Sequence, residues 1–336
     1  MYHVKLSIAQ DNVGCARQLP KSNLEHRGYC FHINEDVEEA DFWVMYSKGR
    51  RISETCKCSA ENTLFITGEP ETVYHYAPGF VKQFARVLSV QASIRHPMMK
   101  MMQPAQPWHI GKISPRDDDG KEKGQKVVYT KNFDTLSISH PEKTKLMSII
   151  TSNKCFTKGH KDRIAFAMAL KEHYGDQLDL FGHGFNSFDD KWDVVAPYKY
   201  HICIENSSFP HYWTEKLADS YLGNSYPIYY GAPNLGDYFP KESFTLIDIN
   251  DINGSINIID EVIANDLAAK NADAVERAKQ LVLNEYNLFD MIIGVLETMN
   301  PDAEKNIITI KPDMAFFDLR KLNVMLFNRI KNKFTK

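Results

Sequence analysis

The stretch YHICIENSSFPHYWTEKLADSYLGNSYPIYYGAP, residues 200–233, decides the fold of this chain. Its first apolar run, 200–204, predicts a buried strand. A helix is predicted over 214–222, because Thr214 is a good N-cap and Gly223 suits the position after the last helical residue. The apolar run PIYY near the end completes a strand, helix, strand unit, and such units build parallel sheets.

The same alternation extends to both sides of this unit. After residue 140, further strands are predicted at 146–150, 178–181 and 244–249, and further helices at 160–174, 255–269 and 274–297. In the first hundred residues, short apolar runs predict strands at 4–8, 42–46 and 64–67. Between 97 and 126, prolines and charges break the periodicity, which indicates a loop or linker.

We therefore predict the α/β class with a doubly wound parallel sheet in each of two lobes, separated by a cleft. The first lobe is expected over 1–126 and the second over 140–310, followed by a basic amphipathic tail at 311–336. The tail either packs on its own protein or contacts anionic lipid at a membrane surface.

Composition excludes several classes of protein. The 336 residues carry a net charge of −3, with 43% hydrophobic and 25% charged residues, which is ordinary globular composition. A nucleic-acid partner is disfavoured, because phosphate-binding surfaces carry a positive excess. No apolar run is long enough for a spanning helix and no signal layout opens the chain, so a cytoplasmic protein, at most peripheral at the inner membrane face, is expected. The six cysteines include one close pair, Cys56 and Cys58, and we interpret them as free thiols rather than metal ligands.

Ligands of open parallel sheets bind at the carboxyl ends of strands, beside helix N-termini. Ser152 and Asn153 follow the predicted strand 146–150, and Arg163 lies early in the next helix. A basic residue there opposes the helix dipole, so Arg163 is predicted to contact an anion such as a phosphate. The alternative is a surface arginine paired with Asp162.

A second candidate segment follows the strand at 200–204. Glu205 and Asn206 come directly after it, and Thr214, Glu215 and Lys216 begin the next helix. A glutamate here can accept hydrogen bonds from a ribose diol, while the adjacent lysine neutralises a diphosphate. The alternative is a capped helix with a solvated Glu–Lys pair.

These segments resemble a family signature. The order YHICIENS, YWTEK, YPIYYGAP and SF, with ITSN, Arg163 and FGHG upstream, is similar to the signature block of the alpha-1,3/4-fucosyltransferases, glycosyltransferase family ten. The resemblance covers about 146–249. It implies a GT-B fold with two Rossmann-like lobes and transfer of L-fucose from GDP-fucose, with inversion, to a glycan hydroxyl. The family's usual acceptor is N-acetylglucosamine in a lactosamine-type unit, in alpha-1,3 linkage.

The resemblance also assigns roles within the second lobe. Arg163 and Lys216 would hold the diphosphate and so act in catalysis, and Glu215 would hold the ribose. Asn206 and Tyr212 would shape the donor site, together with Ser152 and Asn153 of the upstream segment. Glu205 either contacts the donor or only orients the loop.

An inverting transfer also needs a base near the acceptor hydroxyl. The segment ITGEP at 66–70 is similar to the family's T-G-E segment, so Glu69 is the predicted catalytic base; the alternative is a turn glutamate. His183 stands where the family commonly has arginine, and Ile249 replaces an aromatic residue. These departures leave open another GDP-6-deoxyhexose donor or a non-catalytic sugar-nucleotide or glycan binder.

No metal or other cofactor is expected, because Arg163 and Lys216 would take the charge that an ion otherwise neutralises. The acidic run Asp117–Asp119 is interpreted as part of a solvated loop. The predicted partners are a GDP-sugar donor and a glycan or lipid-linked oligosaccharide acceptor, as for a bacterial enzyme that decorates lipopolysaccharide.

Overall fold

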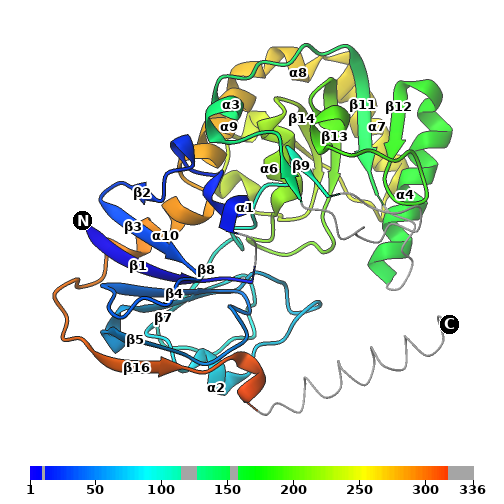
Figure 1. The fold of residues 1–336 in the computed structure, drawn as a ribbon. Helices are drawn as coiled ribbons and strands as arrows, with labels where there is room; N and C mark the ends of the chain where they lie inside the picture. Colours follow the sequence, from blue (N-terminus) through cyan, green and yellow to red (C-terminus); the bar gives the residue numbers. More distant parts are fainter. Residues whose placement is uncertain (10–11, 115–126, 152–157, 317–336) are drawn as a thin grey trace. The chain divides into compact units, whose positions relative to one another are not determined.

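The computed structural model describes residues 1–9, 12–114, 127–151 and 158–316, which form two compact units (Figure 1). The first unit contains Met1–Ala16, Asn23–Pro104 and the described residues from Met291 onward, and the second contains Arg17–Ser22 and Ala105–Asp290. Each unit has its own sheet, parallel in all or most of its strand pairs, and its own core. The α/β class with two Rossmann-like lobes is therefore confirmed.

The first unit has a seven-stranded sheet in the order β2-β3-β1-β4-β6-β7-β8. All neighbours are parallel except β2 and β3. The strands are β1 Tyr2–Ser7, β2 Glu25–His26, β3 Tyr29–Ile33, β4 Phe42–Tyr46, β6 Thr63–Ile66, β7 Arg86–Ser89 and β8 Met99–Met101. The helical elements are α1 Asn12–Ala16, η2 Ala60–Asn62, α2 Pro78–Val81 and η6 Asp313–Ala315. An antiparallel pair, β5 Glu54–Cys58 with β16 Asn306–Ile310, packs through Cys56, Cys58 and Ile310 into the same core.

The second unit has a five-stranded sheet in the order β12-β11-β13-β14-β15, parallel throughout. Its strands are β11 Lys145–Ile150, β12 Leu178–Phe181, β13 Tyr198–Ile204, β14 Tyr226–Tyr230 and β15 Thr245–Leu246, with a short pair β9 Lys112–Ile113 and β10 Val128–Tyr129. The helices are α3 Phe133–Ser137, α4 Lys158–Tyr174, α5 Lys191–Val195, α6 Glu215–Leu222, α7 Ile252–Ala264, α8 Leu267–Lys270 and α9 Ala272–Asn284, with 3-10 turns η1 Pro20–Ser22, η3 Gly175–Gln177, η4 Leu235–Asp237 and η5 Lys241–Ser243. They flank the sheet in two groups, α6 with α9 and α4 with α7 (Figure 1). A buried apolar cluster fills the space between sheet and helices.

Two predicted helices are each divided. The helix predicted over 255–269 is α7 followed by α8, because Asp266 adopts a left-handed conformation with φ 46°. The helix predicted over 274–297 is α9 followed by α10, Leu288–Leu296. Asn287 starts α10 by accepting hydrogen bonds at its Oδ1 from the N–H groups of Phe289 and Asp290, at 2.9 and 3.0 Å.

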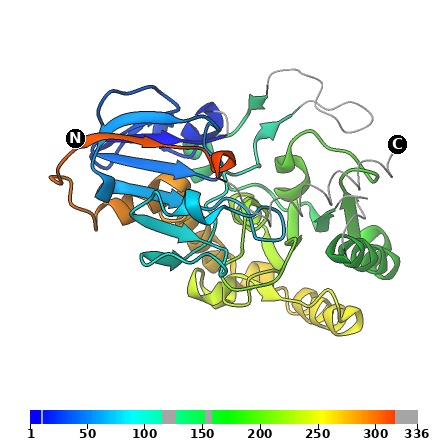
Figure 2. The same ribbon diagram turned by 90° about the horizontal axis from the view of Figure 1, so that it is seen from below.

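The residue boundaries of the two compact units differ from those predicted for the two lobes. The segment predicted as a linker contains β8 and β9, and its Trp108 and Ile110 are buried in the core of the second unit. Arg17 fixes this segment by donating to the carbonyl oxygen of Ile110 at 2.8 Å. Near the other end of the chain, β16 lies beside β5 of the first unit (Figure 2). The chain therefore returns to its first unit before residue 310.

The segment after residue 310 is described only as far as Phe316. Asp313 accepts hydrogen bonds from the Tyr74 hydroxyl at 2.5 Å and the Ala77 N–H at 2.9 Å, so this segment packs on the first unit. The remainder of the predicted basic tail and the acidic run 117–119 lie outside the described residues. Within the described ranges, no helix has the length and apolar character that a membrane-spanning helix needs.

Candidate active site

The candidate site lies at the carboxyl edge of the second unit's sheet. The strand order β12-β11-β13-β14-β15 reverses its direction of winding between β11 and β13. Ligands of such sheets bind at this switch point, outside the carboxyl ends of the strands. Thr151 follows β11 there, and Glu205 follows β13. The predicted Ser152 and Asn153, which come next after Thr151, lie outside the described residues.

Arg163 stands on α4 beside this edge. It is 9% exposed, and its guanidinium donates to the Asn206 Oδ1 at 2.7 Å. Its Nε is buried and has no hydrogen-bond partner among the described residues. Burial lowers the pKa of Arg163, and Glu205 nearby opposes that shift, so the group stays cationic. A buried cation with an unused donor is suited to an anionic ligand.

Glu205 is fully buried at the end of β13. Its carboxylate accepts from both the N–H and the hydroxyl of Thr214 at 2.8 Å, and the Lys216 Nζ lies 3.3 Å away. Burial raises the pKa of Glu205 and the Lys216 charge opposes this. This arrangement agrees with the alternative in which Glu205 orients the loop, because its oxygens are already occupied.

Thr214 is the N-cap of α6, as predicted, and its hydroxyl accepts from the Lys216 N–H at 3.3 Å. Lys216 lies 3.3 Å from Glu215 as well as from Glu205, and its side chain is 26% exposed. Although burial opposes it, the two carboxylates raise the pKa of Lys216. Lys216 is therefore a fixed cation with one side open to solvent.

Glu215 is buried, with 6% of its surface exposed. Its Oε2 has no hydrogen-bond partner within the described part of the chain. Burial acts to raise the pKa of Glu215, but the charge of Lys216 outweighs it and holds this pKa below its usual value. The alternative of a solvated Glu–Lys pair at the start of α6 is wrong, since Glu215 is ionised in a buried position with an acceptor oxygen unused.

Asn206 and Tyr212 belong to the loop between β13 and α6. Asn206 is exposed, and its side-chain oxygen is held by Arg163. Tyr212 is buried, stacks on Phe209 with ring centroids 4.7 Å apart, and accepts at its carbonyl from the Tyr229 hydroxyl. The structure thus brings together Arg163, Asn206, Glu215 and Lys216 around the switch point, with Tyr212 in the loop that connects them.

Gly182, in the FGHG segment, packs directly against the backbone of Thr151 at the end of β11. Its φ is +123°, and a Cβ there would collide with the carbonyl oxygen of Thr151. Only glycine allows this approach. The neighbouring His183 is exposed. The FGHG segment therefore supports the residue that immediately precedes Ser152.

Three residues of this region were missed from the sequence. Asp219 on α6 accepts from the N–H groups of His109 and Ile110 at 3.0 and 2.9 Å, and from the Lys191 Nζ at 2.7 Å. His109 in turn lies 3.7 Å from Glu215. The spacing of Glu215 and Asp219 on one helix face was available as a signal. No sequence pattern pointed to His109 or Lys191, because both residues are far from α6 in the sequence.

Glu69 belongs to the first unit and lies three residues after the end of β6. It is partly buried, and its carbonyl oxygen accepts from the Gln91 Nε2 at 2.7 Å. Burial raises the pKa of Tyr76, and the charge of Glu69 adds to that shift. The turn is thus well held, and the role of Glu69 stays a prediction.

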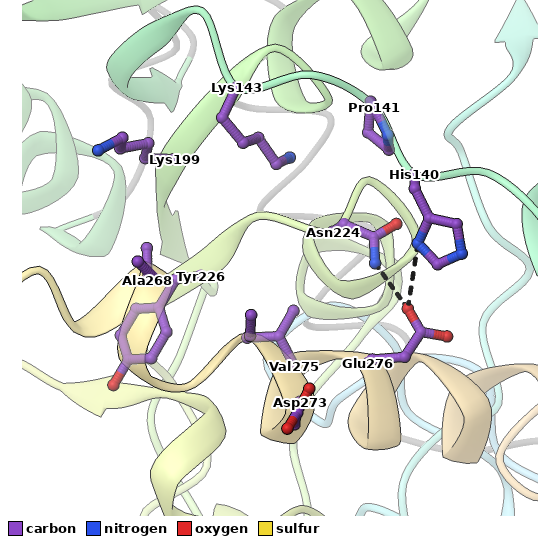
Figure 3. A pocket seen from close by; sticks show the side chains of 12 residues that line it. His140, Pro141, Lys143, Lys199, Asn224, Tyr226, Ala268, Asp273, Val275 and Glu276 are labelled. Atoms are coloured by element: carbon purple, nitrogen blue, oxygen red, sulfur yellow. Dashed lines mark hydrogen bonds and ion pairs between the residues drawn. The ribbon is translucent and has the colours of Figure 1, made fainter.

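Two cavities among the described residues of the second unit bear on the location of the site. One of about 320 Å³ is at the carboxyl ends of β14 and β15, lined by Ser208, Tyr230 and Asp248 among others. A larger one of about 500 Å³ lies at the amino ends of the strands (Figure 3). There Lys143 already donates to the carbonyl oxygens of Ala196 and Gly223, both at 2.7 Å. The first cavity is at the edge where ligands of parallel sheets bind.

Comparisons with known proteins match parts of this chain. The model of glycosyltransferase family 10 (fucosyltransferase), C-terminal part, matches residues 140–266. An alpha-(1,3)-fucosyltransferase FucT of Helicobacter pylori is 32% identical over 77 residues, which are 23% of this chain and 16% of that protein. The 4-galactosyl-N-acetylglucosaminide 3-alpha-L-fucosyltransferase 9 of Mus musculus is 26% identical over 152 residues, 44% of this chain and 38% of that one. The matched regions therefore span less than two fifths of either relative's length.

Solved structures resemble the chain at low sequence identity. A crystal structure of alpha1,3-fucosyltransferase with GDP-fucose gives a TM-score of 0.47 at 18% identity, covering 88% of this chain and 89% of that one. An alpha-glucosyltransferase in complex with UDP-glucose and DNA gives 0.48 at 8% identity, covering 88% and 99%.

Proposed function

We propose that the chain is a member of glycosyltransferase family 10, whose model matches residues 140–266, and that it transfers L-fucose from GDP-fucose to a hydroxyl of a glycan, with inversion at the anomeric carbon. The second unit would bind the donor and the first unit the acceptor. The observation that carries most weight is Arg163, a buried cation at the switch point of the sheet whose Nε has no hydrogen-bond partner within the ranges that the structure describes.

The diphosphate would lie against Arg163 and Lys216. Negative charge builds on the departing GDP during an inverting transfer, and fixed cations stabilise that charge best where little water enters. Arg163 is buried, and Lys216 is held by two carboxylates with one side open. Both cationic side chains are therefore already held in position before the donor binds. We expect the reaction to proceed without a metal ion for this reason.

The ribose and the loop residues complete the donor site. Glu215 would accept from the ribose hydroxyls, because its Oε2 is the carboxylate oxygen that has no partner in the described structure. Asn206 would connect Arg163 to the donor, and Tyr212 would shape the loop. Ser152 and Asn153, which follow Thr151 in the sequence, would contact the diphosphate.

Glu69 would take the proton from the acceptor hydroxyl on the side of the anomeric carbon away from GDP. The proposed acceptor is N-acetylglucosamine in a lactosamine-type unit, on a surface glycan such as lipopolysaccharide, with an alpha-1,3 linkage. The departures at His183 and Ile249 favour one other candidate, a different GDP-6-deoxyhexose donor with the same mechanism.

Calorimetric titration tests the donor site before an acceptor is known. The full chain is titrated in EDTA with GDP, GDP-fucose, GDP-mannose and UDP-galactose. We expect binding of GDP and GDP-fucose, lost in Arg163→Ala and Lys216→Ala and kept in Lys161→Ala, an exposed neighbour on α4. A folded protein that ignores all four nucleotides, or that requires a divalent ion to bind them, contradicts the proposal. Preference for another GDP-deoxyhexose, added to the panel, would favour the second candidate.

A further inference from the structure

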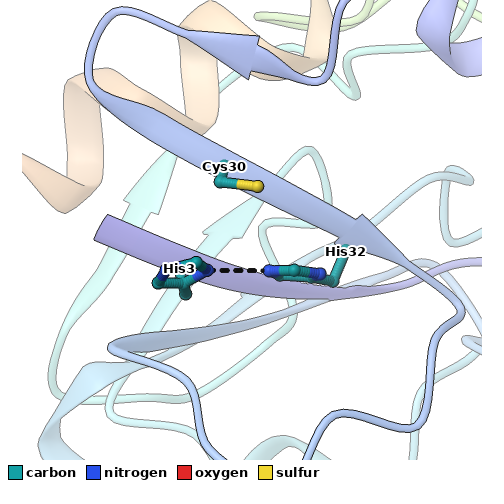
Figure 4. A group of neighbouring side chains, drawn as sticks. All are labelled: His3, Cys30 and His32. Atoms are coloured by element: carbon teal, nitrogen blue, oxygen red, sulfur yellow. Dashed lines mark hydrogen bonds between the residues drawn. The ribbon is translucent and has the colours of Figure 1, made fainter. Parts of the chain in front are cut away.

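Three side chains of metal-ligand type gather on one face of the first unit's sheet (Figure 4). His3 is on β1, and Cys30 and His32 are on β3. His3 pairs with Cys30 in the parallel register, and His32 is two residues further along the same strand. Residues two apart on a strand share a face, so all three point the same way. Their ligand atoms lie within 4.8 Å of one another, and within the described ranges this is the one such group of three or more.

The two imidazoles are aimed at the same point. The His3 Nδ1 and the His32 Nε2 are 2.9 Å apart, and the rings are stacked with centroids 5.2 Å apart. Two nitrogens bound to one tetrahedral zinc ion at about 2.0 Å each are separated by about 3.3 Å. The pair therefore needs to open by only a few tenths of an ångström to admit an ion between the two nitrogens.

A carboxylate fixes the orientation of His32. Its Nδ1 lies 3.1 Å from the Glu35 Oε2, which can accept the Nδ1 proton. The tautomer that satisfies this contact leaves a lone pair on Nε2, the nitrogen that faces His3. Carboxylate–histidine pairs of this kind commonly support metal ligands.

The charges around Cys30 favour a cation. Glu25 on β2 pairs directly with Cys30 in the antiparallel register, so its carboxylate is on the same face. Burial raises the pKa of the Cys30 thiol, and Glu25 and Glu35 raise it further. The nearby Lys5 ammonium is committed to Glu54 at 3.3 Å and to the carbonyl oxygen of Glu35 at 2.7 Å. A bound cation would offset the carboxylates and displace the thiol proton.

We propose that His3, Cys30 and His32 form a binding site for Zn²⁺ or a chemically similar divalent ion, with Glu25 or water as the fourth ligand. One thiolate and two imidazoles are a donor set that zinc prefers, and the ion's binding releases the Cys30 proton to solvent. The site is separate from the proposed donor residues, which belong to the second unit, and from Glu69. It does not depend on the proposed reaction.

Cobalt titration tests the site directly. The full chain is stripped with a chelator and titrated with Co²⁺, whose bond to a thiolate gives a charge-transfer absorption that bonds to nitrogen and oxygen do not. We expect one Co²⁺ per chain, displaced by Zn²⁺. Cys30→Ser should abolish the thiolate absorption, and His32→Gln should weaken binding at least tenfold. His26→Gln, a histidine of the same sheet outside the cluster, should bind as the unchanged chain does.

The supporting glutamate provides a second, milder variant. Glu35→Gln keeps all three ligands and should weaken Co²⁺ binding by about 10- to 100-fold, as loss of such partners commonly does. Circular dichroism confirms that each variant is folded, and Zn²⁺ should raise the melting temperature of the unchanged chain but not of Cys30→Ser. Absence of the thiolate absorption in the unchanged chain, or its full retention in folded Cys30→Ser, overturns the proposal.

Discussion

The carboxylate of Glu205 accepts hydrogen bonds from both the backbone N–H and the hydroxyl of Thr214, each at 2.8 Å. Since Thr214 caps α6, one buried carboxylate connects the end of β13 to the start of that helix. Lys216, two residues on, lies 3.3 Å from the same carboxylate. The position of the proposed diphosphate cation therefore depends on the Thr214 hydroxyl.

Replacing Thr214 tests this dependence. Thr214→Val keeps the shape but leaves the buried Glu205 with one donor fewer, which should cost about 1–3 kcal/mol of unfolding free energy. It should also weaken GDP binding, because Lys216 loses its support. Thr214→Ser keeps the hydroxyl and should behave nearly as the unchanged chain. Urea unfolding and GDP calorimetry measure both effects; equal behaviour of the two variants would show that the hydroxyl does not hold the site.

The substitution Arg163→Lys tests whether GDP binding needs only the positive charge of Arg163 or also the planar shape of its guanidinium. Lysine keeps a positive charge, but it lacks the planar fork that reaches Asn206 and an anion at the same time. We expect GDP affinity to fall about 10- to 100-fold, the range that losing charge-assisted hydrogen bonds gives. Lys161→Ala on the same helix controls for general loss of charge. If Arg163→Lys binds GDP normally, Arg163 does not contact the diphosphate as proposed.

Two glycines with positive φ form a matched pair. Gly175 has no atom within 4 Å of the position that a Cβ would occupy, so Gly175→Ala should cost only the conformational strain of about 1–2 kcal/mol. Gly182→Ala should cost more, because its Cβ collides with the carbonyl oxygen of Thr151. It should also reduce GDP affinity by displacing the end of β11, whereas Gly175→Ala should not. Melting temperatures and GDP titrations of the two variants distinguish a local support from a general loss of stability.

The free energy of unfolding should decrease at acidic pH, because His201 takes up a proton when the chain unfolds. This histidine is buried in β13, its Nδ1 lies 2.8 Å from the Ser148 hydroxyl, and burial lowers its pKa to about 3. In the unfolded chain the pKa is about 6.5, so between these values only the unfolded state takes up the proton. The unfolding free energy should therefore decrease as the pH falls from about 6.5 toward 3, by up to about 1.4 kcal/mol per pH unit.

Denaturant unfolding at pH 7 and pH 5 measures this slope. His201→Asn offers a side-chain amide in place of Nδ1 and cannot titrate, so its slope should be smaller than that of the unchanged chain. Identical slopes would show that His201 does not account for the loss of stability.

Local periodicity explains which parts of the fold were predictable. The strand at 42–46 agrees with β4, because a buried parallel strand is a continuous apolar run. The strand at 178–181 agrees with β12, in which the buried Leu178 and Leu180 alternate with half-buried residues. The pairing of β5 with β16 joins residues about 250 positions apart, and nothing local encodes it. β3 was missed, although its buried Tyr29, Phe31 and Ile33 alternate with Cys30 and His32 in the pattern of a strand.

The candidate site likewise contains features that the local sequence predicts and features that only the folded chain creates. Thr214, Glu215 and Lys216 are neighbours in sequence, so their joint role at a helix start could be predicted. The contacts of Asp219 with His109 and Lys191 join three segments that only the folded chain brings together. Likewise, the burial of Arg163, whose Nε finds no partner among the residues described, is a tertiary property that its position early in a helix did not reveal.

Glu69→Gln tests the proposed base. The amide keeps the size of the side chain and leaves the Gln91 contact to the main-chain oxygen in place, so the turn should remain folded. It cannot accept a proton from the acceptor, and fucosyl transfer should fall about 10²- to 10⁴-fold. GDP affinity should be unchanged, because the donor residues belong to the other unit. Glu71→Gln, two residues on and exposed, is the matched control and should transfer normally. Normal transfer by Glu69→Gln would remove Glu69 from the mechanism, whereas an equal loss in both variants would indicate a charge effect of the turn rather than a base.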